Sequence, residues 1–123
     1  MLLFATVLTF TACSDDDEPD IELTKSIVVG TWDINSATAD GETVTIPQGY
    51  AYITLKSDYS YKVVLFGDYY IGTYKIEGNT VVGTTIDPIT EYFKFESLDG
   101  NDAVINYSNS TGDKYKFVVQ KRS

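Results

Sequence analysis

Hydrophobic and polar residues alternate along most of the chain after residue 29, as at Phe93 and Phe95, which are separated by Lys94 and followed by Glu96. Turn-forming residues interrupt the alternation roughly every 8–12 residues, a spacing typical of short strands in an all-β domain. A period of two places alternate side chains on one face of a β-strand. The pattern therefore predicts short antiparallel strands that each bury one face.

The pattern predicts eight or nine strands, with Leu23–Val28 before them as the one candidate helix. Asp40-Gly41, Gly67-Asp68, Glu77-Gly78-Asn79 and Asp99-Gly100-Asn101 are the turn signals that separate several of them. The first strand begins at Gly30, and the others cover residues 43–46, 52–56, 61–66, 69–76, 80–85, 92–98, 103–107 and 115–121.

Short hairpin connections make strands that follow each other in sequence neighbours in space. A meander of this many strands, apolar on one face, has to curl to bury that face, and closing it removes the exposed edges. We therefore predict an all-β fold, an antiparallel up-and-down meander of about eight to nine strands. It forms either a small barrel or a rolled half-barrel.

The composition agrees with this fold and limits the chemistry. The chain has ten tyrosines, a residue favoured on half-buried pleated surfaces, and no histidine. Without histidine there is no Ser-His-Asp or Cys-His arrangement and no imidazole ligand for a transition metal. A single cysteine excludes an internal disulfide. We expect no catalytic residues, no metal and no cofactor.

The acidic charge is concentrated at the start of the chain. The formal net charge is −9, and residues 1–22 hold six of the 18 acids and none of the nine Lys and Arg residues. Residues 23–123 therefore carry 12 acids against nine bases, a net charge of −3. This domain lacks the basic face that neutralises phosphates, so we expect no nucleic-acid partner.

Residues 1–22 differ from the rest in pattern as well. Leu2 to Phe10 form an apolar stretch that is too short to span a bilayer but fits the apolar region of a secretory signal. The alternative is that residues 1–13 form a first strand or helix with Cys13 as a buried thiol. That alternative places apolar residues directly before an acid run that cannot be buried. We interpret residues 1–12 as a signal peptide, 13–22 as an acidic tether and 23–123 as the folded domain.

Ala12-Cys13 resembles the end of a bacterial lipoprotein signal, which implies that Cys13 is lipidated and anchors the chain to a membrane. Cys13-Ser14 followed by acidic residues resembles the surface-export signal of lipoproteins in the Bacteroides group of bacteria. The acid run can also be a solvated spacer, because like charges repel and extend the segment. The resemblance implies an outer-membrane location facing outward, with the periplasmic face as the alternative.

The domain resembles the lipocalin-like domain of lipoproteins from the Bacteroides group over residues 24–121. The blocks that carry the resemblance are Val29-Gly30-Thr31-Trp32, 53–58, 72–81 and Tyr92-Phe93-Lys94-Phe95-Glu96. The resemblance implies a small antiparallel barrel with Trp32 plugging one end. True lipocalins pack an arginine from near the chain end across this tryptophan, and Arg122 is the candidate for that role.

Four aromatic residues are candidates for ligand contact. Tyr50, Tyr69 and Tyr70 lie near predicted strand ends, where tyrosine offers a flat apolar face and a polar tip. Each also fits the outer face of a strand. Trp32 is interpreted first as a core plug and second as a stacking surface for a ligand. Tyr61 and Tyr74 share strand faces with apolar residues, which favours the core for both.

Other motifs favour structural roles. Asp99-Gly100-Asn101-Asp102 lacks the spacing and the distal glutamate of a calcium loop and is interpreted as a hairpin turn. Gly72 and Gly83 lie inside strands, which predicts bulges or tight barrel corners. No carboxylate pair typical of a glycosidase stands out. The domain carboxylates are expected to face solvent; they include Asp33, Glu77, Glu91 and Glu96.

These observations support one leading hypothesis and two alternatives. The first is a non-enzymatic, lipid-anchored envelope protein that binds a small apolar or sugar-like ligand. The second is a structural or protein-interaction module of an envelope assembly, with a barrel filled by its own side chains and no small ligand. The third is an enzyme that uses carboxylates or tyrosine. An internal cavity favours the first hypothesis, and a filled barrel favours the second.

Overall fold

The computed structural model describes residues 21–122, so the predicted signal peptide, Cys13 and most of the predicted tether lie outside the described residues. A short helix, α1 (Lys25–Val28), precedes nine strands in this part of the chain. The strands are β2 (Gly30–Ala39), β3 (Glu42–Thr45), β4 (Tyr52–Leu55), β5 (Ser60–Leu65), β6 (Asp68–Glu77), β7 (Thr80–Thr85), β8 (Thr90–Asp99), β9 (Asp102–Asn109) and β10 (Lys114–Lys121).

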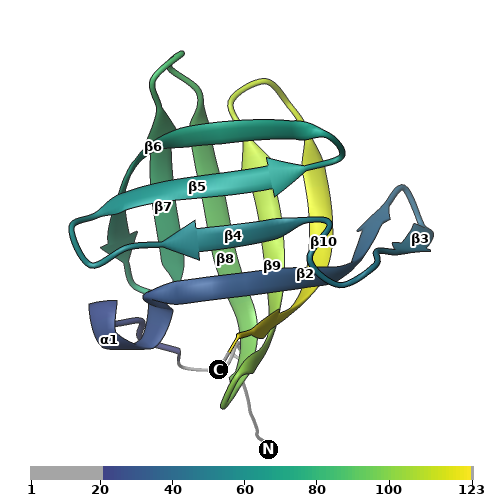
Figure 1. The fold of residues 1–123 in the computed structure, drawn as a ribbon, viewed down its shortest axis with the longest axis horizontal. Coiled ribbons are helices and arrows are strands. Elements are labelled where there is room, and N and C mark those ends of the chain that lie inside the picture. The colour runs from purple at the N-terminus through teal and green to yellow at the C-terminus, as the bar shows by residue number, and fades with distance from the viewer. Residues whose placement is uncertain (1–20, 123) are drawn as a thin grey trace, which may run out of the picture.

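The strands form a closed antiparallel barrel (Figure 1). From β4 onward each strand pairs with the next along the chain, β2 pairs with β4, and β10 returns to pair with β2. The barrel therefore has eight strands, and β3 is an additional strand that projects from the wall beside the end of β2. The predicted all-β meander is confirmed, and of the two predicted forms the chain adopts the closed one.

The strand boundaries follow the hydrophobic alternation to within about two residues, but one turn differs. The turn between β5 and β6 consists of Phe66 and Gly67 rather than Gly67 and Asp68. Both turn residues have positive φ, 49° and 89°, as a tight two-residue hairpin requires. Asp68 is therefore the first residue of β6, and Phe66 adopts a backbone conformation that usually belongs to glycine or asparagine.

An irregularity in β2 changes which of its residues face inward. Val118 of β10 pairs with Ser36, whereas the next residue, Val119, pairs with Ile34, so Asn35 is an extra residue in β2. Because of this bulge, Ile34 and Ala37 are both buried although they are three residues apart.

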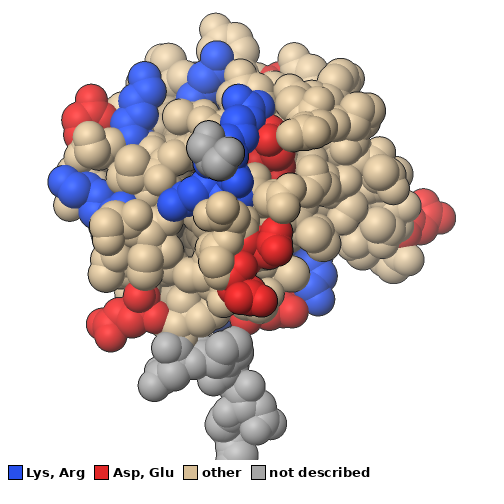
Figure 2. Space-filling model, turned by 60° about the horizontal axis from the view of Figure 1, so that its bottom comes forward, with Lys and Arg blue, Asp and Glu red and all other residues tan. Residues whose placement is uncertain are grey.

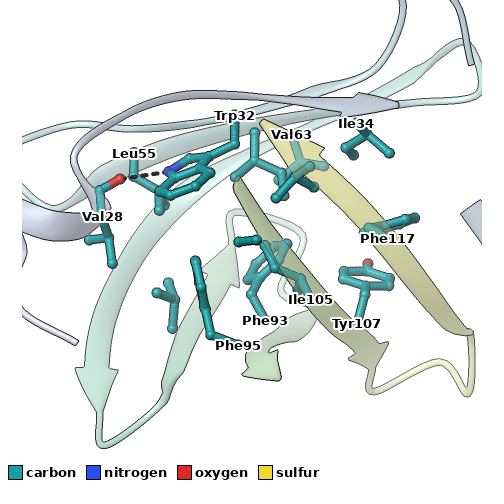
Figure 3. Packing of buried hydrophobic residues seen from close by; sticks show 14 of the residues in the cluster. Val28, Trp32, Ile34, Leu55, Val63, Phe93, Phe95, Ile105, Tyr107 and Phe117 are labelled. Carbon is teal, nitrogen blue, oxygen red and sulfur yellow. Dashed lines mark hydrogen bonds between the residues drawn. The ribbon is translucent and has the colours of Figure 1, made fainter. Parts of the chain in front are cut away.

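The interior is filled by side chains from opposite walls (Figure 3). The largest fully buried aromatic side chains are those of Trp32, Phe93, Phe95 and Phe117. Trp32 and Phe95 meet edge to face, with ring centroids 5.6 Å apart. Fully burying a large apolar side chain contributes about 1.5–3 kcal/mol, so these residues make up much of the driving force for folding.

Helix α1 covers one end of the barrel, which we call the closed end. The hydroxyl of Thr24 caps the helix by accepting from the Ile27 amide at 3.3 Å. The Leu23 amide donates to the Gly78 carbonyl at 2.9 Å and ties the start of the domain to the β6–β7 turn. The indole N–H of Trp32 donates to the Val28 carbonyl at 3.0 Å, so helix and barrel are joined at this end (Figure 3).

A lysine, not the expected arginine, lies across Trp32. The ammonium of Lys121 lies 5.1 Å from the centre of the Trp32 ring and donates to the Ile27 carbonyl at 2.6 Å. Lys121 pairs with Trp32 in the register of β10 and β2, which places it over the ring. Arg122, one residue further, lies 5.2 Å from the centre of the Tyr52 ring instead.

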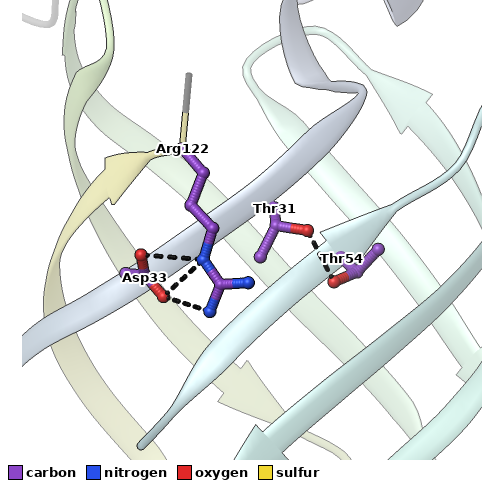
Figure 4. Close-up of polar contacts among 4 residues, drawn as sticks. All are labelled: Thr31, Asp33, Thr54 and Arg122. Carbon is purple, nitrogen blue, oxygen red and sulfur yellow. Dashed lines mark hydrogen bonds and ion pairs between the residues drawn. The ribbon is translucent and has the colours of Figure 1, made fainter. Parts of the chain in front are cut away.

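Arg122 binds Asp33 on the outer face of the barrel (Figure 4). Its guanidinium nitrogens donate to both carboxylate oxygens at 2.7–3.1 Å. Asp33 was expected to face solvent, yet it is only 3% exposed. Its side chain does point outward, as the alternation predicts, but Arg122 covers it, and the ion pair compensates the buried charge.

The closed end and the wall beside it carry charges of both signs. Figure 2 brings this end forward and shows Lys and Arg side chains gathered on one part of the face, with Asp and Glu mainly along its lower side. Besides Lys121 and Arg122, Lys25 of α1 lies 4.8 Å from the centre of the Tyr59 ring. Basic residues of the chain therefore cover three aromatic rings at and beside this end.

Candidate ligand site at the mouth of the barrel

The end opposite α1 is hollowed, and we call it the mouth. A cavity of about 260 Å³ opens there between the β5–β6 turn and the β9–β10 turn. We call its lining the mouth site, which consists of Leu65, Phe66, Asp68, Tyr70, Tyr107, Asn109, Asp113 and Tyr115.

A buried carboxylate lies inside the barrel next to the mouth site. Glu91 of β8 is 0% exposed, and each of its oxygens accepts a hydrogen bond from a tyrosine. Tyr61 donates to Oε1 at 2.6 Å and Tyr107 to Oε2 at 2.5 Å. An ionised carboxylate only accepts hydrogen bonds, and short bonds of this type are the strong, charge-assisted ones.

Two glycines allow Tyr61 to reach Glu91 across two intervening strands. Gly83 pairs with Glu91, and a Cβ at Gly83 would lie 2.5 Å from the Tyr61 ring, so its absence leaves room for the ring. Gly72 pairs with Tyr61, and a Cβ there would lie 1.9 Å from the Thr84 carbonyl oxygen of β7. Gly72 thus permits the close backbone approach of a tight corner, whereas Gly83 accommodates a side chain.

The expectation that Glu91 faces solvent is wrong. Glu91 has the same parity as Phe93 and Phe95, so the strand that buries those rings also points Glu91 inward. The predicted strand began at Tyr92, which left Glu91 outside the alternation. Extending the alternation by one residue places Glu91 on the inward face. The tyrosines on β5 and β9 compensate for its burial because each donates a hydrogen bond to one carboxylate oxygen.

The β9–β10 turn holds the second tyrosine in place. The Asn109 amide group donates to the Tyr107 hydroxyl at 3.0 Å, and the Asn109 Oδ1 accepts from the backbone amides of Thr111 and Asp113 at 3.1 Å. Burial raises the pKa of Tyr61 and of Tyr107, and the hydrogen bond that each donates to Glu91 raises it further. Both hydroxyls therefore keep their protons for Glu91 well above neutral pH.

Aromatic rings form one side of the cavity. Phe66 and Tyr115 have ring centroids 5.7 Å apart, and Tyr115 stacks on Tyr107 at 6.2 Å. Tyr70 lines the same cavity from β6. Burial raises the pKa of Tyr70, and the negative charges of Asp68, Glu91 and Asp113 raise it further, so three carboxylates act on one hydroxyl.

Phe66 is held in a strained backbone conformation at this site. It has a φ of 49° and is 46% exposed. The left-handed conformation costs a residue with a Cβ roughly 1–2 kcal/mol, and glycine or asparagine would avoid much of that cost. Strained residues cluster at functional sites, and here the strain places an aromatic ring over the cavity.

Of the four sequence-predicted ligand residues only Tyr69 and Tyr70 come together, in a small outer hollow of about 190 Å³. Tyr70 lines the mouth site, and Tyr69 points outward, 66% exposed, beside Lys62. Tyr50 is 58% exposed in the connection between β3 and β4, and Trp32 is buried under α1 at the other end of the barrel. Tyr61 and Tyr74 are buried in the core, as their strand faces predicted.

Sequence reasoning missed the other rings of the mouth site. Tyr115 is the first residue of the predicted last strand, and its half-buried side chain packs against the core at the mouth end of β10. Phe66 was placed in the strand before the turn instead of in the turn itself. Tyr107 lies near the mouth end of β9. The sequence signal that identifies them is that each stands at the end of a predicted strand, 61–66, 103–107 or 115–121.

A larger, shallower hollow of about 590 Å³ lies on the outer face of the barrel. Its lining includes outward-facing residues of β8, β9 and β10, such as Lys94, Asn106 and Lys116. Lys116 is paired there with Glu96 at 3.3 Å. Tyr107 and Tyr115 belong to both linings, but the buried Glu91 points into the barrel and not toward the outer groove. The mouth site is the deeper of the two hollows and has this buried carboxylate beside it.

The two buried carboxylates lie apart. Asp33 is bound to Arg122 on the outer face, whereas Glu91 is bound to tyrosines inside the barrel. Within residues 21–122 there is no group of three or more His, Cys, Asp or Glu side chains arranged to hold a metal ion. No helix in the described part of the chain is long and apolar enough to cross a membrane.

Comparisons of the chain with protein-family models, with curated proteins and with solved structures found no match.

Proposed function

We propose that the protein is a lipid-anchored binding protein of the outer membrane that takes up a small ligand at the mouth of its barrel. The observation that carries the ligand part is the mouth site, a cavity of about 260 Å³ with four aromatic residues in its lining and the buried Glu91 beside it. Ligand sites are concave and mostly apolar, with a few precisely placed polar groups.

The size and position of the cavity limit the ligand. A volume of about 260 Å³ is just below the usual range for drug-sized ligands, roughly 300–1,000 Å³. The interior below the mouth is filled by Trp32, Phe93 and Phe95. A small ligand with a flat or compact apolar part and polar groups, such as a sugar-like molecule, therefore fits better than a long apolar chain.

The anchor part of the proposal rests on Cys13. It is compatible with the end of the barrel at which the described chain begins. The described chain begins beside the β6–β7 turn, where Leu23 binds Gly78. That turn belongs to the closed end, so a tether that leads from Cys13 reaches the barrel at the end opposite the mouth. The mouth would then open away from the membrane.

Protein purified from its host tests the ligand part directly. Native mass spectrometry is expected to show a retained small molecule on the wild-type protein and on Tyr50→Leu, whose side chain lies outside the mouth site. Tyr115→Leu, which removes a ring from the cavity, is expected to lose it. If both variants retain the ligand equally, the ligand binds outside the mouth site. If the wild-type protein retains no ligand and binds none that is added to it, the binding function is contradicted.

Labelling cells with a fatty acid tests the anchor. The wild-type protein is expected to take up the label and Cys13→Ala is not; equal labelling of the two rules out an anchor at Cys13. Protease treatment of intact cells tests orientation, and full protection would place the domain on the periplasmic face.

The second candidate function, an interaction module without a small ligand, is favoured by two observations. The interior is largely filled by the protein's own side chains, and the projecting strand β3 is exposed along its length, with Val44 53% exposed. Crosslinking in the host tests it. A partner captured by the wild type and lost with Val44→Asp, combined with an empty mouth, would favour this function over ligand binding.

A further inference from the structure

We propose that the ligand of the mouth site is a small organic cation, a quaternary ammonium or a protonated amine. This inference rests on the proposed binding function and names the chemical class of the ligand. It is carried by three features of the mouth site: its rings, its charge, and the absence of Lys and Arg from its lining.

The rings offer the surface that an ammonium group prefers. Phe66, Tyr107 and Tyr115 form a connected array, with neighbouring ring centroids 5.7 Å and 6.2 Å apart, and Tyr70 lines the same cavity. An aromatic face carries negative electrostatic potential and attracts a cation within about 6 Å of its centre. Aromatic cages of this kind are the usual device for recognising quaternary ammonium groups.

The charged side chains that line the mouth site are both acidic. Asp68 and Asp113 line the cavity, Glu91 is buried beside it, and the lining includes no Lys or Arg. The field of the three carboxylates reaches the Tyr70 hydroxyl, where it raises the pKa of that group beyond the effect of burial. An anionic ligand would be repelled here, whereas a cation is attracted by the carboxylates and the ring faces, which compensate for part of its lost hydration.

Elsewhere in the protein four aromatic rings are covered by Lys or Arg side chains of the chain itself. Lys25 lies over Tyr59, Lys62 over Tyr69, Lys121 over Trp32 and Arg122 over Tyr52. None of these four rings, which all lie within residues 21–122, belongs to the mouth site. At the mouth site the rings lie beside carboxylates instead, and no Lys or Arg of the described residues belongs to the lining.

The chemistry of the lining favours an organic cation over a metal ion. Calcium and magnesium require six or more oxygen ligands at short range. The mouth site offers two surface carboxylates among four aromatic residues, and rings do not replace oxygen ligands. A compact, weakly hydrated ammonium group matches both the rings and the volume of about 260 Å³.

Calorimetric titration of the purified full chain tests the proposal with choline as the probe. The control is the neutral isostere of choline, in which a carbon atom replaces the ammonium nitrogen, at the same ionic strength. Choline is expected to bind at least about tenfold more tightly than this isostere, because the isostere keeps the shape and loses the charge.

Matched variants locate the site. Asp68→Asn removes one carboxylate of the lining and is expected to weaken choline binding by about threefold, and Tyr115→Leu by about tenfold. Asp99→Asn removes the same charge at the closed end and is expected to leave binding unchanged. Circular dichroism of each variant establishes that the barrel is folded before the titrations are compared.

The outcomes separate this inference from the function on which it rests. Equal affinity for choline and its isostere, or an Asp68→Asn variant that binds choline like the wild type, overturns cation recognition and leaves the mouth as a binding site. Absence of choline binding overturns the cation proposal in any case. If protein from the host also retains no ligand, the proposed binding function fails with it.

Discussion

The two ends of the barrel use the same residue types in opposite ways. At the closed end Trp32 is sealed by α1 and covered by Lys121, and beside that end Arg122 neutralises Asp33, so each group finds its partner within the chain. At the mouth, aromatic rings and carboxylates lie together without a basic residue in the lining, and Phe66 is held in a strained conformation. The closed end therefore satisfies its rings and charges within the chain, whereas the mouth leaves rings and carboxylates facing a cavity.

The largest expected loss of folding stability is at the closed end. Trp32→Ala should lower the free energy of unfolding by about 3–5 kcal/mol, because it leaves a cavity under α1 and removes the hydrogen bond to Val28. Urea denaturation followed by circular dichroism measures the loss. Trp32→Phe, which keeps a ring, should lose clearly less. A loss below about 1 kcal/mol for the alanine variant would mean that this end does not carry the stability.

The mouth contains one feature whose loss also costs stability, the buried network of Glu91. Tyr107→Phe should lower the free energy of unfolding by about 1–3 kcal/mol at neutral pH, because one oxygen of the buried carboxylate loses its donor. The exposed Tyr50→Phe is the matched control and should change it by less than about 0.5 kcal/mol. Equal stability of both variants would indicate that the hydrogen bond from Tyr107 to Glu91 does not stabilise the barrel.

The same network predicts a loss of stability in alkali. In the unfolded chain Tyr61 and Tyr107 lose their protons near pH 10, whereas burial and the bonds to Glu91 keep the pKa of both higher in the barrel. Their contribution to stability is therefore complete below pH 10. Above it, stability should fall by up to about 1.4 kcal/mol per pH unit for each tyrosine.

Urea midpoints measured between pH 8 and pH 11 test this expectation. Tyr61→Phe removes one of the two groups bonded to Glu91 and should reduce the slope above pH 10 by up to about 1.4 kcal/mol per pH unit. A slope that is the same in the variant and the wild type would assign the alkaline loss to other groups.

A smaller effect is expected beside the closed end at Arg122. Arg122→Gln should cost about 1 kcal/mol, since it uncovers Asp33, and the 46% exposure of the arginine side chain limits the loss by solvent screening. Lys75→Gln breaks the fully surface-exposed pair with Glu77 and should cost less than about 0.5 kcal/mol. If the two variants lose the same amount, the burial of Asp33 has no energetic consequence.

The smallest change in stability is expected at Phe66. Variants of this residue also separate the effect on stability from the effect on ligand binding. Phe66→Asn and Phe66→Leu both remove the ring and should both weaken ligand binding at the mouth. Asn tolerates positive φ, so the Asn variant should be more stable than the Leu variant by about 0.5–1 kcal/mol. Thermal unfolding and choline titration of the pair measure both effects, and a more stable Leu variant would show that the turn is not strained.

The sequence predicted those parts of the molecule that depend on local patterns. Hydrophobic alternation and turn chemistry are properties of neighbouring residues, and they located the strands and most of the hairpins. The position of Lys121 over Trp32 could not be found in this way, because a bulge in β2 shifts the register between two strands at opposite ends of the chain.

The mouth site was only partly predictable for the same reason. Tyr70 was found because it stands near a strand end, but the network around Glu91 joins tyrosines 30 and 16 residues away. An inward-facing carboxylate contradicts the rule that charged residues face solvent, and only its long-range partners make it acceptable. Functional sites are where such local rules are expected to fail.

The pairing of β10 with β2 also sets the order of events when the protein is made. The barrel cannot close until residues 114–121 are available, because they supply the partner of the first strand. Until then the growing chain is an open sheet with two unpaired edges, a form that aggregates readily. Joining strands this far apart in sequence also slows folding. Residues 114–121 therefore complete the fold, and a chain without this strand should remain in the open form.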